Sequence, residues 1–157
     1  MSRRRRAVKR KILPDSIYDN VLIAKFINRV MRSGKKSRAQ KIVYGALQQF
    51  AKKVHAEDPI VAFDRAMENA MPSLEVKSRR IGGTTYQVPI EIPSERRETL
   101  AMKWIIIHAR KKVGRDMISG LTMELADCFN NQGTTIKKKD DTHRMAEANK
   151  AFAHYKW

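Results

Sequence analysis

The sequence is poor in the residue types that several protein classes require. A single cysteine, Cys128, occurs among its 157 residues, so one chain can form neither a disulfide framework nor a cysteine-rich zinc site. Apolar runs are short, as at residues 104–107, whereas a bilayer crossing takes roughly 20 apolar residues. No apolar stretch follows the basic N-terminus as it does in a signal peptide. We therefore expect a cytoplasmic protein with no membrane partner.

Catalytic and cofactor motifs are also missing. The sequence has no HExxH metal motif and no GxxxxGK[ST] phosphate loop, and its four histidines are scattered. His108 follows an isoleucine run and is best interpreted as a packed helical residue. The pair Asp140-Asp141 could in principle hold a metal, but it follows three lysines, which favours a solvated helix surface. We expect no enzyme activity, no cofactor and no metal site.

Acidic residues are scarce relative to basic ones. Asp and Glu number 16 against 33 Lys and Arg, which gives a formal net charge of +17. Self-repulsion on this scale disfavours a compact state unless a polyanion neutralises it. A basic surface kept only for solubility is a weaker interpretation, because added acidic residues improve solubility more than added basic ones. The usual polyanions are nucleic acids and anionic membranes, and nothing in the sequence requires a membrane.

The basic residues are most concentrated at the N-terminus. Residues 1–12 contain seven basic side chains and no acidic one. Such a block repels itself and stays disordered in solution. We interpret it as a flexible arm that becomes ordered on a polyanion.

Most of the remaining chain has helical periodicity and enough apolar residues for a core. Five segments repeat apolar residues every three to four positions. They begin near Asp19 or Asn20, Ser37, Asp58-Pro59, Pro93-Ser94 and Asp116. Residues 134–157 have a thinner apolar stripe, which predicts a peripheral C-terminal helix. The expected fold is a single mainly α domain over residues 1–157.

One segment changes to the alternating pattern of a β-hairpin. Apolar residues alternate between residues 74 and 92 around Gly82-Gly83. A two-residue turn pairs Val76 with Pro89, whereas a three-residue loop at 81–83 pairs Val76 with Val88. We favour the second register, because it keeps the apolar residues on one face. A lone hairpin is marginally stable, so its base should pack on the helices while its tip projects.

Basic residues also cluster in turns and at helix ends, where side chains and free backbone N–H groups can meet phosphates together. Tyr86 near the hairpin tip could stack on an unpaired base or pack on the hairpin itself, and the sequence does not decide between these roles. No helix-turn-helix or leucine-zipper pattern indicates reading of a DNA groove. The clusters outside the arm are Arg32, Lys35, Lys36 and Arg38; Lys77, Arg79 and Arg80; Arg96 and Arg97; and Lys103, Arg110, Lys111, Lys112 and Arg115.

Several long stretches resemble a known family. The start MSRRRRAVKR, the stretches FINRVMRSGKKSRAQKIVYGAL, PIVAFDRAMENAMPSLEVKSRRIGGTTYQVPIEI and PSERRETLAMKWIIIHAR, and the ending AEANKAFAHYKW are similar to ribosomal protein seven of the bacterial small subunit. The resemblance covers essentially the whole chain. It implies a bundle of six helices with a β-hairpin between the third and fourth, which agrees with the change of period.

The resemblance also implies a role and a set of partners. The protein would bind the 3′ major domain of 16S rRNA early and nucleate the head of the small subunit. It would lie near the exit-site tRNA and the mRNA, beside small-subunit proteins nine and eleven, and some members repress their own operon's message. The positions to which the RNA-facing role carries over are Arg3, Arg4, Arg5, Arg6, Lys9, Arg10, Lys11, Gly34, Lys35, Lys36, Ser37, Arg38, Lys77, Arg79, Arg80, Gly82, Gly83, Thr84, Thr85, Tyr86, Arg96, Arg97 and Arg110.

Two other functions fit the composition less well. A DNA-compacting architectural protein would share the charge but should bind any duplex. An RNA-modifying enzyme would need a catalytic grouping that the sequence does not offer.

Overall fold

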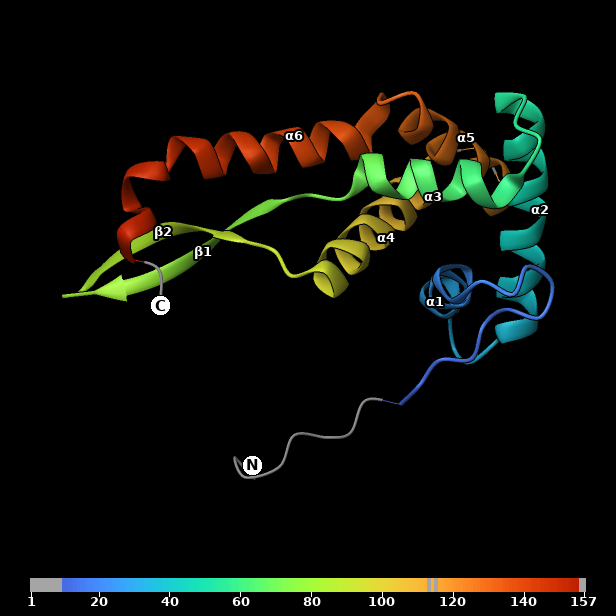
Figure 1. The fold of residues 1–157 in the computed structure, drawn as a ribbon, viewed down its shortest axis with the longest axis horizontal. Helices are drawn as coiled ribbons and strands as arrows, with labels where there is room; N and C mark the ends of the chain where they lie inside the picture. The colour runs from blue at the N-terminus through green and yellow to red at the C-terminus, as the bar shows by residue number, and fades with distance from the viewer. Residues whose placement is uncertain (1–9, 113, 115, 156–157) are drawn as a thin grey trace.

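The computed structural model describes residues 10–112, 114 and 116–155. Within them, helices α1 to α6 and a two-stranded antiparallel hairpin, which follows α3 and precedes α4 along the chain, make up a mainly α fold, as predicted (Figure 1). The elements are α1 Val21–Val30, α2 Lys36–Val54, α3 Pro59–Ala70, β1 Leu74–Ile81, β2 Thr84–Glu91, α4 Ser94–Lys111, α5 Met117–Phe129, α6 Gly133–Ala148 and the short 3₁₀ helix η1 Lys150–Tyr155.

Three helices begin directly after residues that the sequence analysis predicted as N-terminal caps. Asn20, rather than Asp19, caps α1, and its side-chain oxygen accepts hydrogen bonds from the N–H groups of Leu22 and Ile23 at 2.7 and 3.2 Å. Asp58 caps α3, with proline at the first helical position. Asp116 caps α5 by accepting from the N–H of Ser119 at 3.0 Å. Each cap satisfies backbone donors that a helix start leaves unpaired.

The hydrophobic core lies where α5 packs against α2, α3 and α4. Phe26, Phe50, Phe63, Leu121 and Leu125 are almost completely buried. The rings of Phe26 and Phe63 meet edge to face, with centroids 5.4 Å apart. Burying each such side chain contributes roughly 1.5–3 kcal/mol. This core holds the ends of α1, α2 and α4 in a rigid arrangement.

The hairpin has the register that we did not favour. Val76 pairs with Pro89, and Gly82 and Gly83 form a two-residue turn with φ values of 55° and 89°. Both turn positions have positive φ, which glycine adopts at no steric cost. Our preference for pairing Val76 with Val88 was wrong because it assumed one covered face. Val88 is fully buried on the face that it shares with Tyr86, whereas Val76 is half-buried on the other.

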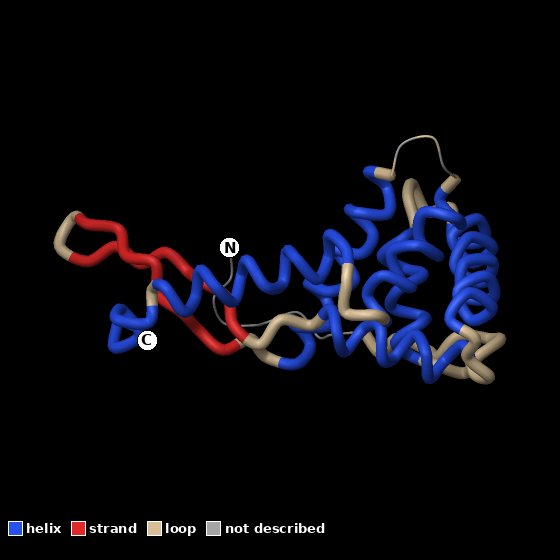
Figure 2. Tube along the Cα trace, turned by 90° about the horizontal axis from the view of Figure 1, so that it is seen from above, coloured by secondary structure: helices blue, strands red, loops and turns tan. Residues whose placement is uncertain are grey.

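The C-terminal segment braces the hairpin. Helix α6 runs along the base of the hairpin, which projects beyond the helical body (Figures 1 and 2). The Nε2 atom of His143 accepts a hydrogen bond from the N–H of Ser73 at 2.9 Å. Beyond α6, the rings of Phe152 and Tyr155 in η1 lie 5.3 and 5.1 Å from Tyr86. These contacts supply the support that an isolated two-stranded hairpin lacks.

Among residues 10–112, 114 and 116–155, no helix combines the length and apolarity that a membrane crossing needs. The same residues contain no group of three or more His, Cys, Asp or Glu side chains arranged to hold a metal ion.

Candidate nucleic-acid interface

The structure brings together predicted residues that are far apart in the sequence. Lys35 and Arg38 at the start of α2 and Arg110 near the end of α4 line one hollow of about 300 Å³. We call it the basic hollow, and its full lining is Val30, Met31, Arg32, Lys35, Arg38, Ala39, Ile42, Arg110 and Met117. Four cationic side chains therefore surround one depression between the ends of α1, α2 and α4.

The turn before α2 positions two of these cations. Residues 31–35 form a tight loop in which Gly34 has a φ of 71°, and the N–H of Lys36 donates to the carbonyl of Gly34 at 2.8 Å. Helix α2 then begins without a side-chain cap and without an acidic residue in its first turn. Basic side chains at the positive end of a helix dipole are unfavourable by themselves. A bound anion would pair with the uncapped N–H groups and also neutralise these basic side chains, since the first N–H groups of a helix point toward such a ligand.

Arg110 is held at the edge of the basic hollow by the backbone. Its Nη2 atom donates to the carbonyl oxygen of Val30 at 3.2 Å. Burial and the nearby charge of Arg32 both lower the pKa of Arg110, although an arginine remains charged at neutral pH. A phosphate placed between Arg32 and Arg110 would relieve their mutual repulsion. The hollow is therefore suited to a polyanion.

The end of the predicted arm lies over α1 and the start of α4. Arg10 and Lys11 are exposed, and with Lys25 and Arg29 they line a second hollow, of about 600 Å³. Glu98 shares this hollow and forms an ion pair with Lys25 at 2.7 Å. The predicted RNA-facing residues Arg3, Arg4, Arg5, Arg6 and Lys9 lie outside the described residues.

The hairpin carries another part of the predicted set at the opposite end of the molecule (Figure 1). Lys77, Arg80 and the tip residues 82–85 are exposed. Tyr86 is half-buried against the C-terminal aromatic rings, so the structure shows intramolecular packing for it. Arg79 is half-buried and donates to the backbone carbonyl of Tyr155.

Two further predicted residues join the hairpin to the helices. Arg96 donates to both carboxylate oxygens of Glu75 at 2.8 Å, and this bidentate pair raises the pKa of Arg96. Arg97 donates to the carbonyl oxygen of Pro72 at 3.0 Å. Both side chains therefore have a structural role at the base of the hairpin.

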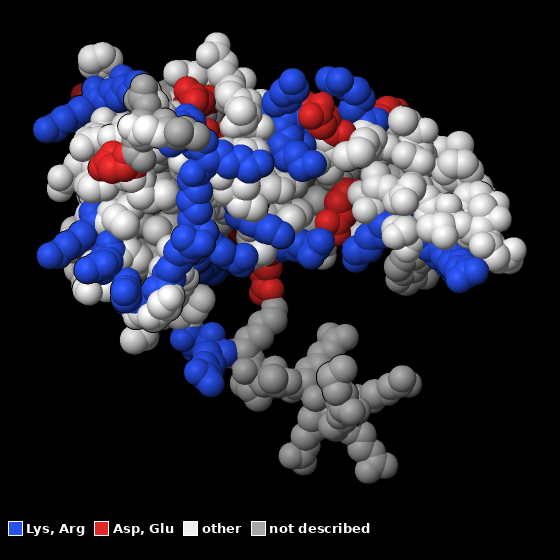
Figure 3. Space-filling model, turned by 180° about the vertical axis from the view of Figure 1, so that it is seen from behind, with Lys and Arg blue, Asp and Glu red and all other residues white. Residues whose placement is uncertain are grey.

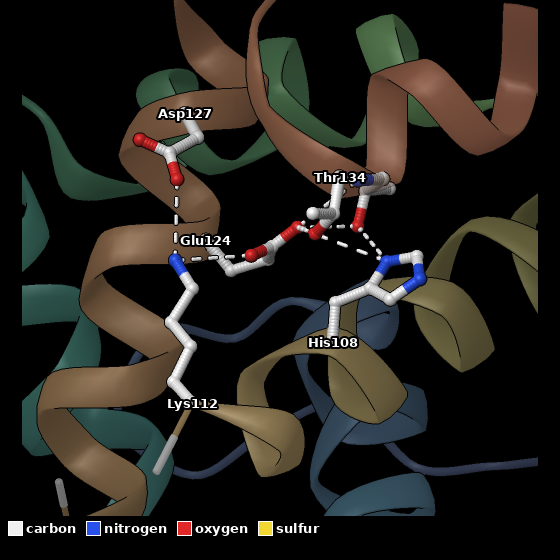
Figure 4. Close-up of polar contacts among 6 residues, drawn as sticks. His108, Lys112, Glu124, Asp127 and Thr134 are labelled. Atoms are coloured by element: carbon white, nitrogen blue, oxygen red, sulfur yellow. Dashed lines mark hydrogen bonds and ion pairs between the residues drawn. The ribbon is translucent and has the colours of Figure 1, made fainter. Parts of the chain in front are cut away.

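The sequence grouped Lys112 with the basic clusters, whereas the structure places it in an internal ion-pair network (Figure 4). The Nζ atom of Lys112 lies 3.0 Å from Glu124 Oε2 and 3.1 Å from Asp127 Oδ2. Glu124 is fully buried and accepts hydrogen bonds from Thr134 and Thr135. His108 donates to or accepts from the Thr135 hydroxyl at 2.9 Å, as expected of a packed histidine. The charge of Lys112 is thus paired with two carboxylates of α5.

Two cations that line the second hollow, Lys25 and Arg29, were absent from the predicted clusters. Arg32, in the basic hollow, belonged to a predicted cluster but not to the residues carried over from the family resemblance. Lys25 and Arg29 are four positions apart, so they share one face of α1, and this spacing was the signal that could have found them. Figure 3 shows Lys and Arg side chains spread over the helical end of the molecule, whereas the hairpin end has fewer on the same face.

Comparisons with known proteins find one family along nearly the whole chain. The model of the family described as ribosomal protein S7p/S5e matches residues 2–150. The chain is 66% identical to small ribosomal subunit protein uS7 of Protochlamydia amoebophila over 157 residues, the full length of both. It is 64% and 62% identical, again over the full length of both chains, to the proteins of that name from Chlamydia pneumoniae and Chlamydia muridarum.

Proposed function

The chain belongs to the ribosomal protein S7p/S5e family, and we propose that it binds the 3′ major domain of 16S rRNA and nucleates assembly of the head of the small subunit. Membership makes it a structural component of the small ribosomal subunit rather than an enzyme. The observation that carries the proposal is the basic hollow, where Lys35, Arg38 and Arg110 meet from distant parts of the chain.

The proposed mechanism is electrostatic capture followed by docking of a rigid shape. The arm and the basic hollow neutralise phosphates and release counterions, which supplies affinity without sequence information. The core holds α1, α2 and α4 fixed, so only an RNA with matching phosphate positions engages all the cations at once. The hairpin, which η1 supports, sets the orientation of the protein on the RNA at the other end of the molecule.

The remaining roles extend the same proposal. Residues 1–157 act as one RNA-binding domain, with residues 1–12 as the arm and residues 134–157 as the peripheral C-terminal segment. The hairpin and the C-terminal segment approach the exit-site tRNA and the mRNA, and small-subunit proteins nine and eleven are neighbours. Repression of its own operon's message would use the same surface on a second RNA.

A competition titration tests the proposed function. The full-length chain is titrated with a folded 3′ major-domain RNA fragment in the presence of excess random duplex DNA, across a salt series. Tight RNA binding at physiological salt supports recognition of RNA shape. Equal competition by DNA, with an affinity that collapses as salt rises, would show that the chain recognises only the charge of a polyanion and would contradict the proposed recognition of RNA shape.

Arg38→Gln is expected to weaken binding to that RNA fragment about tenfold, since one charge-assisted contact contributes roughly 1.5 kcal/mol or more. Arg38 is exposed, so the protein should keep its stability. The matched control is Arg144→Gln, because Arg144 is 80% exposed on α6, away from the basic hollow. Equal losses for the two variants would show that only net charge matters.

Removal of residues 1–12 is expected to weaken RNA binding and flatten its salt dependence with little change in melting temperature. Each phosphate that the shortened chain no longer neutralises reduces the slope of log K against log salt by about 0.7 to 0.9. The fold should tolerate the cut, because residues 10–12 are exposed and, among the described residues, burial begins at Asp15, which accepts a hydrogen bond from the Tyr44 hydroxyl at 2.7 Å. Calorimetry of both chains checks stability, and a large fall in melting temperature would make the arm structural.

A further inference from the structure

The basic hollow is lined partly by apolar residues, Val30, Met31, Ile42 and Met117, which phosphate binding alone does not require and which we call its floor. Val30 is 6% exposed, and Met31, Ile42 and Met117 are half-buried where they pack against the core. Their remaining exposed hydrocarbon lines the same hollow as the four cations. A phosphate pressed against this floor would lose hydration and gain no hydrogen bond from it. The floor therefore indicates that the ligand also has an apolar part.

An unpaired nucleotide combines the two properties that this hollow matches. Its base is a flat π-face that stacks on apolar and aromatic side chains and on guanidinium planes, and its flanking phosphates are anionic. A continuous duplex presents sugars and phosphates to the protein and keeps its base faces stacked inside. The hollow's volume of about 300 Å³ is at the lower end of the range for sites that enclose a small ligand.

We infer that the basic hollow takes the base of one unstacked RNA nucleotide. The base lies on Met31, Ile42 and Met117, and its flanking phosphates lie against Arg32, Lys35 and Arg38. Arg110 is tied to the carbonyl of Val30, so its guanidinium is already oriented beside the floor. Methionine side chains are adaptable enough to fit bases of different shape, so the site selects an unpaired nucleotide more than a particular base.

This inference rests on the proposed function, because it names the RNA feature that the same surface recognises. An apolar side chain of a protein partner is the competing occupant of such a floor. The surrounding cations Arg32, Lys35, Arg38 and Arg110 disfavour it, since burying them under a neutral partner would leave their charges without counterions.

The test uses the full-length chain with ¹³C-labelled methionine methyl groups, observed by NMR. It is titrated with an adenosine pentamer and with an abasic pentamer that carries the same phosphates. The adenosine pentamer is expected to bind about tenfold more tightly and to shift the methyl signals of Met31 and Met117. Met67 is fully buried in the core and is the internal control, whose signal should not move. Equal affinities, or unmoved signals for Met31 and Met117, would overturn the inference.

A matched pair of variants separates the floor from the cations. Ile42→Thr should weaken binding of the adenosine pentamer more than binding of the abasic pentamer, whereas Arg38→Gln should weaken binding of both. Val61→Thr, at a 65% exposed position on α3, controls for the effect of replacing an apolar β-branched residue by threonine outside the basic hollow. If Ile42→Thr weakens both probes equally, the floor has no contact with a base.

The folded 3′ major-domain RNA distinguishes failure of the inference from failure of the proposed function. RNA binding that shifts the Met31 and Met117 signals supports both. RNA binding that leaves these two signals in place contradicts the inference alone. No binding of that RNA at physiological salt contradicts the proposed function.

Discussion

Lys112→Met is expected to lower the free energy of unfolding by about 3 kcal/mol. The substitution removes the cation from Glu124, which is fully buried and would keep its negative charge in the interior. Breaking a buried ion pair from one side typically costs 3–5 kcal/mol, and the lower end applies because the Lys112 side chain is 23% exposed. Urea unfolding of both proteins at neutral pH measures the difference.

The double variant Lys112→Met/Glu124→Gln is the matched control. Glutamine keeps an acceptor for Thr134 and Thr135 but carries no charge, so the double variant should be more stable than Lys112→Met alone. Such non-additivity is expected of residues in one network. Additive losses would show that Lys112 stabilises the fold through packing of its side chain instead.

The same network predicts a pH dependence with a definite sign. Burial by itself raises the pKa of Glu124, but hydrogen bonds from Thr135 and Lys112 outweigh it and lower the pKa below its ordinary value. The stability that Glu124 contributes is therefore complete above about pH 4.3, the ordinary pKa of a glutamate, and is lost as pH falls through the lowered value. The stability difference between wild type and Glu124→Gln should shrink over that acidic range. A difference that stays constant down to about pH 3 would show that the charge of Glu124 contributes little.

Gly120→Ala is expected to lower the free energy of unfolding by about 2 kcal/mol, although alanine is the better helix former. A Cβ atom at this position of α5 would lie 2.8 Å from the carbonyl oxygen of Ala109 in α4. That neighbour is backbone, so the two helices would have to move apart. Thermal or urea unfolding measures the effect.

Gly45→Ala, in α2, is the control for Gly120→Ala. Its Cβ would meet the Cδ1 atom of Ile118 at 3.3 Å, the end of a flexible side chain that can turn away. The gain in helix propensity, about 1 kcal/mol, should offset this contact and leave stability nearly unchanged. Similar losses at both positions would mean that close approach of α4 and α5 is not what Gly120 provides.

Local signals in the sequence were sufficient to predict the helices. Asn20, Asp58 and Asp116 cap three of them because each can reach backbone N–H groups within its own first turn. The position of the hairpin could also be predicted locally, because the turn depends on Gly82 and Gly83 themselves. Its register could not, because the choice depends on what covers each face, and η1 from the far end of the chain packs on Tyr86, on the face where Val88 is buried.

Arg110 and Lys112 show most clearly what the sequence determined and what only the tertiary structure decided. The sequence by itself determined a basic run at the end of α4 and, through its 33 Lys and Arg against 16 Asp and Glu, a strongly positive net charge. It could not assign the two residues different roles, because both are cations two positions apart. The packed fold places Arg110 beside the turn between α1 and α2 and Lys112 beside Glu124 of α5. A charge becomes a binding group or an internal ion pair according to the groups that folding brings next to it, and those groups come from distant segments of the chain.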